Sequence, residues 1–216
     1  MYIQDLFYSY QGEGPFIGYP QIFIRFFGCN IHCAYCDEPD RNKTPMSVDE
    51  VIDTISPWVK KKPHSISITG GEPLLQVDAL KTLIPKLTLP LYLETNGILH
   101  KHLEEVKDMF DYYAVDYKPG YDKEFTDFVS LIKDKKGLFI KYVVIKDFPI
   151  LDIQKMSKII SALNPNIPLI LQPVTPFAGI KEKASPKDIE RAFTCAKTYL
   201  SDVRIIPQTH KLMGLK

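Results

Sequence analysis

Strands and helices alternate along most of this chain, and that alternation limits the folds open to it. Seven short runs have strand-like apolar patterns, and stretches with a helical apolar stripe lie between them. The runs are 22–27, 65–69, 91–94, 113–117, 139–145, 169–173 and 203–206. Strands that alternate with helices form a parallel sheet with right-handed crossovers. A closed eight-fold barrel averages about 250 residues. This α/β chain of 216 residues is therefore predicted to form an incomplete (β/α)6-type partial TIM barrel.

Helix signals support this reading. Ser47 and Glu50 form a capping box, and an apolar stripe follows them. Ser185 with Pro186 marks another helix start, expected to run to about residue 200. Further helices are expected around 103–106, 125–132 and 153–163. No linker or low-complexity stretch divides the chain, so residues 1–216 are expected to form a single domain.

The unusual polar loops all follow strands. They are a cysteine-rich loop after the first strand, Gly70-Gly71-Glu72-Pro73, Glu94-Thr95-Asn96-Gly97, Asp116-Tyr117-Lys118 and Gln172-Pro173-Val174-Thr175. The carboxyl ends of parallel strands share one edge of the sheet, where ligand sites collect in such folds. One active site at that edge is predicted.

The cysteine-rich loop carries Cys29, Cys33 and Cys36 at spacing CX3CX2C. Three thiolates on a four-iron cluster leave one iron free to bind another ligand, and Tyr35 is placed to cover such a cluster. A Cys3His zinc site that includes His32 is the alternative, but it packs four ligands into eight residues. A disulfide framework fits a long chain with three crowded cysteines poorly. Cys195 lies in a helical pattern, where a buried thiol is expected.

Composition argues against several classes of function. Net charge is +1, so nothing indicates binding to nucleic acid or to an anionic membrane. No apolar run approaches ~20 residues, and the N-terminus has no signal-peptide pattern. Free thiols suit a reducing compartment, and a cytoplasmic protein is expected.

With Gly70-Gly71-Glu72-Pro73 downstream, CX3CX2C resembles the radical S-adenosylmethionine (SAM) superfamily. Gln11-Gly12-Glu13-Gly14, Arg25 and Gln208-Thr209-His210-Lys211 further resemble the 7-carboxy-7-deazaguanine synthase family, over nearly the whole chain. That resemblance implies a carbon–nitrogen lyase of 7-deazapurine (queuosine-type) biosynthesis. A [4Fe-4S] cluster would reduce SAM to a 5′-deoxyadenosyl radical, which takes a hydrogen from C6 of 6-carboxy-5,6,7,8-tetrahydropterin. The ring then contracts, ammonia leaves and SAM is regenerated.

The resemblance also implies roles for particular residues, although it assigns none as a catalytic side chain. The cluster would be held by Cys29, Cys33 and Cys36. SAM would be held by Tyr35, Cys36, Asp37, Gly71, Asp116, Tyr117, Lys118, Gln172, Pro173, Val174 and Thr175. The pterin would be held by Tyr10, Gln11, Gly12, Glu13, Arg25, Thr69, His210 and Lys216. Glu94 and Asn96 are further candidates for ribose or methionine contacts.

From the residues alone, two of these assignments stay open. Residues 11–15 could be a Gly-Pro turn that joins two strands. Arg25 could be an edge residue, or a clamp that pairs with the substrate carboxylate through its bidentate fork.

Glu38 departs from the family pattern, which has a hydroxyl residue there as a ligand of Mg2+. A carboxylate is a strong oxygen ligand for this hard cation, so Glu38 is the candidate ligand. A direct bond to substrate and a solvated loop residue are the alternatives.

The implied partners are an electron donor such as flavodoxin or ferredoxin, and a second copy of the chain in a homodimer. Two other functions remain open: a glycyl-radical enzyme activase or another radical SAM enzyme, and a non-enzymatic iron–sulfur or zinc-binding module.

Overall fold

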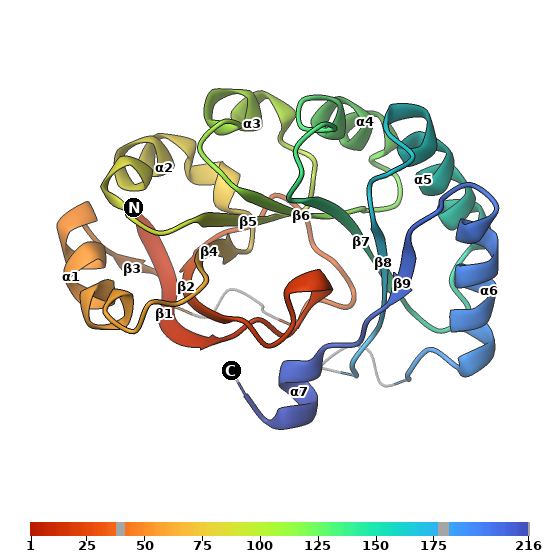
Figure 1. Cartoon of the computed structure of the whole chain (residues 1–216), viewed down its shortest axis with the longest axis horizontal. Helices are drawn as coiled ribbons and strands as arrows, with labels where there is room; N and C mark the ends of the chain where they lie inside the picture. The colour runs from red at the N-terminus through yellow and green to blue at the C-terminus, as the bar shows by residue number, and fades with distance from the viewer. Residues whose placement is uncertain (38–41, 177–181, 216) are drawn as a thin grey trace.

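The computed structural model describes residues 1–37, 42–176 and 182–215, and the strands in these ranges form one curved sheet (Figure 1). The strands are β1 Tyr2–Tyr10, β2 Pro20–Phe26, β3 Thr44–Pro45, β4 Ser65–Gly70, β5 Leu91–Thr95, β6 Tyr112–Asp116, β7 Leu138–Val144, β8 Leu169–Pro173 and β9 Val203–Ile205. The α-helices are α1 Val48–Val59, α2 Val77–Leu83, α3 His100–Val106, α4 Asp122–Ser130, α5 Ile150–Leu163, α6 Pro186–Lys197 and α7 Thr209–Met213. Short 3-10 helices are η1 Gly14–Phe16, η2 Pro73–Gln76 and η3 Ile84–Lys86.

The sheet is an open partial barrel, as the sequence predicts. Its strand order is β3-β1-β2-β4-β5-β6-β7-β8-β9. The strands from β2 to β9 in this order pair in parallel, and β1 and β3 add an antiparallel edge. Helix α1 comes after the short antiparallel strand β3, helices α2 to α6 each come after a parallel strand, and all six cover the convex face (Figure 1). The concave face is thereby left for the loops that carry the site.

All five predicted helices are present as α1, α3, α4, α5 and α6, with ends that differ by a few residues. The capping box of Ser47 and Glu50 starts α1, and Ser185 caps α6, which ends at Lys197 rather than at residue 200. Helices α2 and α7 were not predicted. Helix α2 directly follows the turn η2, and α7 has only five residues, so neither offers a long apolar period.

The two faces of the sheet differ in chemistry. Aliphatic side chains such as Ile24, Ile68 and Leu93 point outward into the main core, under the helices. A second, smaller cluster on the concave face consists of Tyr92, Ala114, Phe139 and Ile170. Alternation along each strand separates these two sets.

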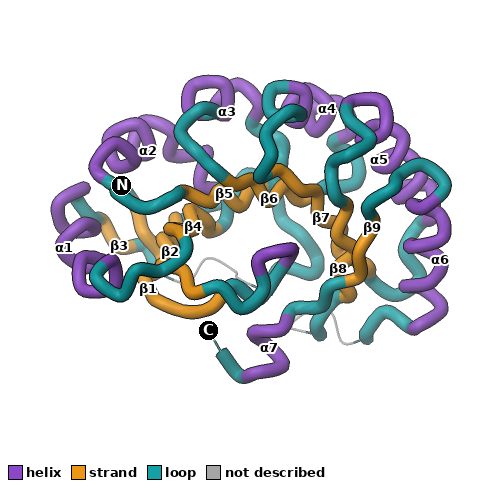
Figure 2. Tube along the Cα trace, in the orientation of Figure 1, coloured by secondary structure: helices purple, strands orange, loops and turns teal. Residues whose placement is uncertain are grey.

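The connection from β1 to β2 closes the concave side. Its turn η1 lies inside the arch of the sheet (Figure 2). Phe16 of that turn packs edge-to-face on Tyr112 at 4.8 Å and on Tyr92 at 5.7 Å between ring centroids. Polar side chains of the same connection therefore lie above an aromatic floor. Among the described residues, no helix combines the length and apolarity that crossing a bilayer requires.

Candidate active site

The cysteine loop follows β2 and is fixed to the end of β4 by close backbone contacts. Gly71 N donates to Phe26 O at 3.3 Å, and Glu72 N donates to Gly28 O at 2.8 Å. A Cβ at Gly71 would lie 2.2 Å from Gly28 O, so only glycine permits this approach. The Gly-Gly-Glu-Pro segment thus sets where the cysteine loop begins.

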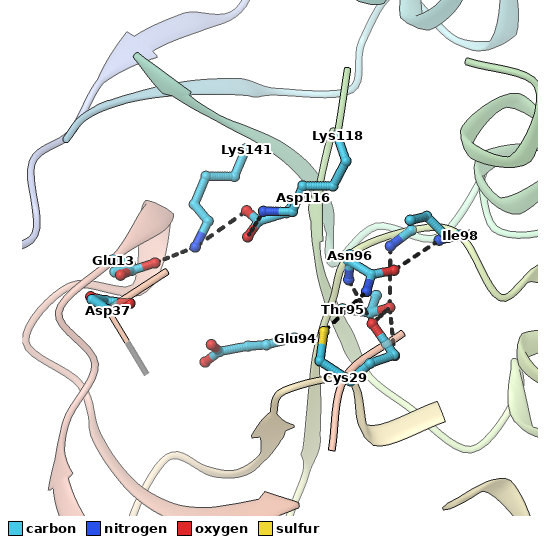
Figure 3. Close-up of polar contacts among 12 residues, drawn as sticks. Glu13, Cys29, Asp37, Glu94, Thr95, Asn96, Ile98, Asp116, Lys118 and Lys141 are labelled. Carbon is cyan, nitrogen blue, oxygen red and sulfur yellow. Dashed lines mark hydrogen bonds and ion pairs between the residues drawn. The ribbon is translucent and has the colours of Figure 1, made fainter. Parts of the chain in front are cut away.

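Glu72 then connects this segment to the loop after β5. Its buried carboxylate accepts hydrogen bonds from Leu74 N at 3.1 Å, Thr95 Oγ1 at 2.9 Å and Asn96 N at 2.8 Å. Burial raises the pKa of Glu72 to about 7, against the partly compensating effect of these donors. Asn96 Nδ2 in turn donates to Asn30 Oδ1 at 2.7 Å and lies 3.9 Å from Cys29 Sγ (Figure 3).

A recess opens on the concave face beside these loops. It is lined by Gln11, Glu13, Tyr92, Glu94, Ala114, Phe139 and Lys141. Glu94 accepts hydrogen bonds from Ser67 at 2.9 Å, Gln11 at 3.1 Å and Thr69 at 3.2 Å. Gln11 is held in turn by Gln21, to whose Oε1 its Nε2 donates at 3.1 Å. Carboxylates therefore point into a recess with an aromatic floor.

Charged side chains alternate across the recess. Lys141 Nζ pairs with Glu13, and it lies 3.3 Å from Asp116 Oδ1 (Figure 3). Asp116 Oδ2 also pairs with Lys118 at 3.3 Å, and the Lys118 ammonium lies 5.1 Å from the Tyr35 ring centroid. Burial alone would lower the pKa of Lys118 and of Lys141. The opposite effect of nearby negative charges is larger: Asp116 raises the pKa of both lysines, and Glu13 and Glu94 also raise that of Lys141. Both lysines therefore remain charged.

The C-terminal segment closes one side of the recess. Gln208 Nε2 donates to Glu13 Oε1 at 2.7 Å and to Asp37 Oδ2 at 3.0 Å. Thr209 donates to Gly12 O through its N at 2.9 Å and its Oγ1 at 3.1 Å. Burial raises the pKa of Asp37, but the Gln208 hydrogen bond and Lys211 at 3.1 Å outweigh it and lower that pKa overall.

Comparisons of the sequence with known proteins assign the chain to a family. The model of the radical SAM superfamily matches residues 23–145. The chain is 39% identical to 7-carboxy-7-deazaguanine synthase of Geobacter sulfurreducens, over 98% of this chain and 96% of the relative. It is 32% identical to the Methanothermobacter thermautotrophicus protein of the same name, over 99% and 97%. The chain belongs to the 7-carboxy-7-deazaguanine synthase family of radical SAM proteins.

A solved structure agrees in fold. The structure titled QueE from Escherichia coli matches with a TM-score of 0.63 over 96% of this chain and 93% of that one. Sequence identity to it is 21%, so this likeness concerns the fold alone.

Membership in the radical SAM superfamily implies a [4Fe-4S] cluster and SAM, and the thiols of this chain fit the cluster. Cys29, Cys33 and Cys36 are all free thiols on one loop. Burial raises the pKa of Cys29 and Cys33, and the charge of neighbouring thiolates adds to this. In the described ranges, no three His, Cys, Asp or Glu side chains are arranged to hold a single metal ion. The family assignment therefore favours the cluster over a Cys3His zinc site.

Several residues that the sequence assigns to the pterin meet at the recess. Gln11 and Glu13 line it, and Thr69 reaches it through Glu94. His210 packs on Gly12, where a Cβ would lie 2.1 Å from its Nδ1. Arg25 pairs with Thr69 across β2 and β4, and its guanidinium lies 5.4 Å from the Phe7 ring centroid.

Other assigned residues lie elsewhere. Tyr10 is 44% exposed at the end of β1 and does not line the recess. The Tyr117 ring packs on Phe125 in the main core, and its hydroxyl donates to Asp122, so only its backbone faces the site edge. Glu38 and Lys216 fall outside the described residues.

The candidate SAM residues lie on the cysteine loop and at the carboxyl ends of β4, β6 and β8. Gln172 is buried, and its Oε1 has no hydrogen-bond partner among the described residues. It belongs to the group Gln172, Pro173, Val174 and Thr175 at the carboxyl end of β8. Glu94, proposed from sequence as a ribose or methionine contact, instead lies with the pterin candidates Gln11 and Thr69.

Lys141 is the main site residue that the sequence analysis did not single out. It is the one charged residue in the run Leu138–Val144, the same signal that marks Arg25 in β2. A lysine inside an apolar strand needs a partner, and the pattern could have identified it on that ground.

Proposed function

We propose that this chain converts 6-carboxy-5,6,7,8-tetrahydropterin to 7-carboxy-7-deazaguanine with release of ammonia, as a radical SAM lyase. The observation that carries the proposal is the 39% identity, over 98% of the chain, to an enzyme of that name. The reaction fits 7-deazapurine (queuosine-type) biosynthesis. The pterin substrate has the same atoms and the same oxidation level as the deazaguanine and ammonia together. The reaction therefore needs no net oxidant, which agrees with SAM being regenerated in each turnover.

The recess supplies the groups that such a substrate needs. The amino-pyrimidinone edge of a pterin presents N–H donors, and Glu13 and Glu94 present carboxylate acceptors. Arg25 would pair with the substrate carboxylate through its bidentate fork. Tyr92 and Phe139 offer an apolar surface beneath a flat ring.

Cys29, Cys33 and Cys36 would hold the cluster. SAM would lie between that loop and the carboxyl ends of β4, β6 and β8, near Gly71, Asp116, Lys118 and Gln172. When bound and reduced, this pair supplies the abstraction of a hydrogen atom from the substrate. The chain itself orients the two ligands and excludes water, with Phe16 below the recess and α7 beside it.

Further parts of the proposal concern ligands and partners. Mg2+ would bind near the substrate with Glu38 as a ligand, and Lys216 would contact the substrate. A flavodoxin or ferredoxin would deliver the electron. The working form would be a cytoplasmic homodimer. A glycyl-radical activase is the alternative activity, and the full-length relatives favour the lyase over it.

Anaerobic turnover tests the proposal. The reconstituted protein, given SAM, a reductant and carboxytetrahydropterin, is expected to form a product with the mass and absorption of 7-carboxy-7-deazaguanine. Cys33→Ala should lose both cluster iron and product. A parent protein with about four irons per chain that cleaves SAM but leaves the pterin unchanged would contradict the proposal and favour an activase.

A further inference from the structure

Lys141 lies where two halves of the candidate site meet. It extends from β7 across the concave face, and its side chain is 11% exposed. On one side it pairs with Glu13, from the connection between β1 and β2. On the other side Asp116, its neighbour in the parallel register of β6 and β7, lies 3.3 Å away. No other described cation pairs with both carboxylates.

These two carboxylates belong to different ligands under the proposed function. Glu13 belongs to the substrate loop, residues 11–14, which Gln208 and Thr209 also contact. Asp116 begins the loop that the family resemblance assigns to SAM, and Lys118 pairs with it as well. Lys141 thus links the substrate loop directly to the SAM loop (Figure 3).

The charge balance explains why a cation is needed at this point. Glu13, Glu94 and Asp116 all act electrostatically on Lys141, and each raises its pKa. Removing one partner of a buried ion pair leaves an uncompensated charge, which is strongly unfavourable. Without Lys141, the Glu13 carboxylate keeps the hydrogen bond from Gln208 but loses this ion pair, so its position is less firmly fixed. That change would displace a group that is expected to accept hydrogen bonds from the substrate.

Resting on the proposed function, we propose that Lys141 is a positioning residue that fixes the substrate loop relative to the SAM loop. In this role it sets the distance between the substrate and the reacting end of SAM. A misplacement of about 1 Å can lower a rate ~100-fold when reacting groups must be held close together. Loss of Lys141 should therefore uncouple SAM cleavage from product formation, rather than simply lower both.

The test uses Lys141→Met, which keeps the length of the side chain and removes its charge. Product formation and loss of SAM to 5′-deoxyadenosine are measured in the same anaerobic reaction. The ratio of abortive cleavage to product is expected to rise at least ~10-fold, within the ~100-fold cost of misplacement. A merely structural role would lower both rates together, would leave the ratio unchanged and would overturn the proposal.

A binding measurement provides a second readout without turnover. 6-Carboxypterin is titrated into the reconstituted, unreduced protein, and quenching of its fluorescence is followed. Lys141→Met should bind it at least ~10-fold more weakly, the cost of one hydrogen bond from the pterin to a Glu13 carboxylate that is no longer held in place. SAM affinity should change less, because Lys118 still holds Asp116. Unchanged pterin affinity would overturn the proposal.

Two variants control for folding and for charge. Lys135→Met removes a lysine whose pair, Asp108 at 2.7 Å, is exposed and remote from the recess, and it should behave as the parent. Lys141→Arg keeps the charge and should restore part of the product-to-cleavage ratio; if it behaves as Lys141→Met, the electrostatic role is wrong. If the parent makes no product, the proposed function is wrong. The titrations of 6-carboxypterin and SAM into the parent and into Lys141→Met still test the role of Lys141 in that case.

Discussion

At the scale of single residues, the site depends on charges placed in apolar surroundings. Arg25 and Lys141 each interrupt an apolar strand, and that pattern is visible in the sequence. What the sequence does not contain is the pairing. Lys141 and Glu13 are 128 positions apart, and only the curvature of the sheet brings them together. The charge at each of these positions is therefore visible within one strand, whereas its partners come from other parts of the folded chain.

Glu72 should make the stability of the fold depend on pH. Its pKa of about 7 in the folded state lies above the ordinary value of 4.5, because burial disfavours the charged form. The folded state therefore binds more protons between these values, and stability falls as pH rises from about 4.5 to about 7. Glu72→Gln should remove this decrease in the free energy of unfolding, which amounts to at most about 3 kcal/mol across the interval. The measurement is Tm against pH for both proteins; parallel curves would contradict the assignment.

Arg25 should matter for the pterin and not for SAM. Arg25→Lys replaces a bidentate fork by a point charge and is expected to weaken 6-carboxypterin binding by about 1–3 kcal/mol. Fluorescence titration measures this change, and the affinity for SAM serves as the internal control. Equal pterin affinity in both proteins would show that Arg25 has only a structural role.

At the scale of elements, a loop and a distant helix form one side of the site. The parallel strands, the main helices and the cysteine loop follow from periodicity, capping and spacing. Helix α7 does not, because five residues carry too little pattern. Its position depends on contacts with Gly12, which is near the other end of the chain. The sequence motifs assign both segments to the pterin, but the direct packing of His210 on Gly12 needed the structure.

Gly12→Ala should displace α7 without disturbing the cluster. A Cβ there would lie 2.1 Å from His210 Nδ1, and Gly12 has no positive φ, so the effect is steric. We expect faster proteolysis of the C-terminal segment and at least ~10-fold slower turnover, as expected for a misplaced binding group. A chain that ends at Gln208 shows the effect of losing α7. If Gly12→Ala resists proteolysis as the parent does, the packing of His210 on Gly12 is not what holds α7.

At the scale of the whole molecule, one edge of a parallel sheet collects groups from nearly every βα unit. The cysteine loop, Glu72 and Asn96 follow strands that end at this edge, and Asp116 and Gln172 lie in the last residues of β6 and β8. That outcome could be predicted, because the direction of parallel strands is set by their crossovers. The recess itself could not, since Phe16, which packs on the lining residue Tyr92, comes from a connection that lies inside the arch.

The most direct measurement of the central claim is the stoichiometry of one anaerobic reaction. SAM, ammonia and 7-carboxy-7-deazaguanine are quantified together as carboxytetrahydropterin is consumed by the reduced, reconstituted protein. The account predicts that ammonia and 7-carboxy-7-deazaguanine appear in equal amounts while SAM persists through many turnovers. Consumption of one SAM for each pterin converted, or product without ammonia, would contradict it.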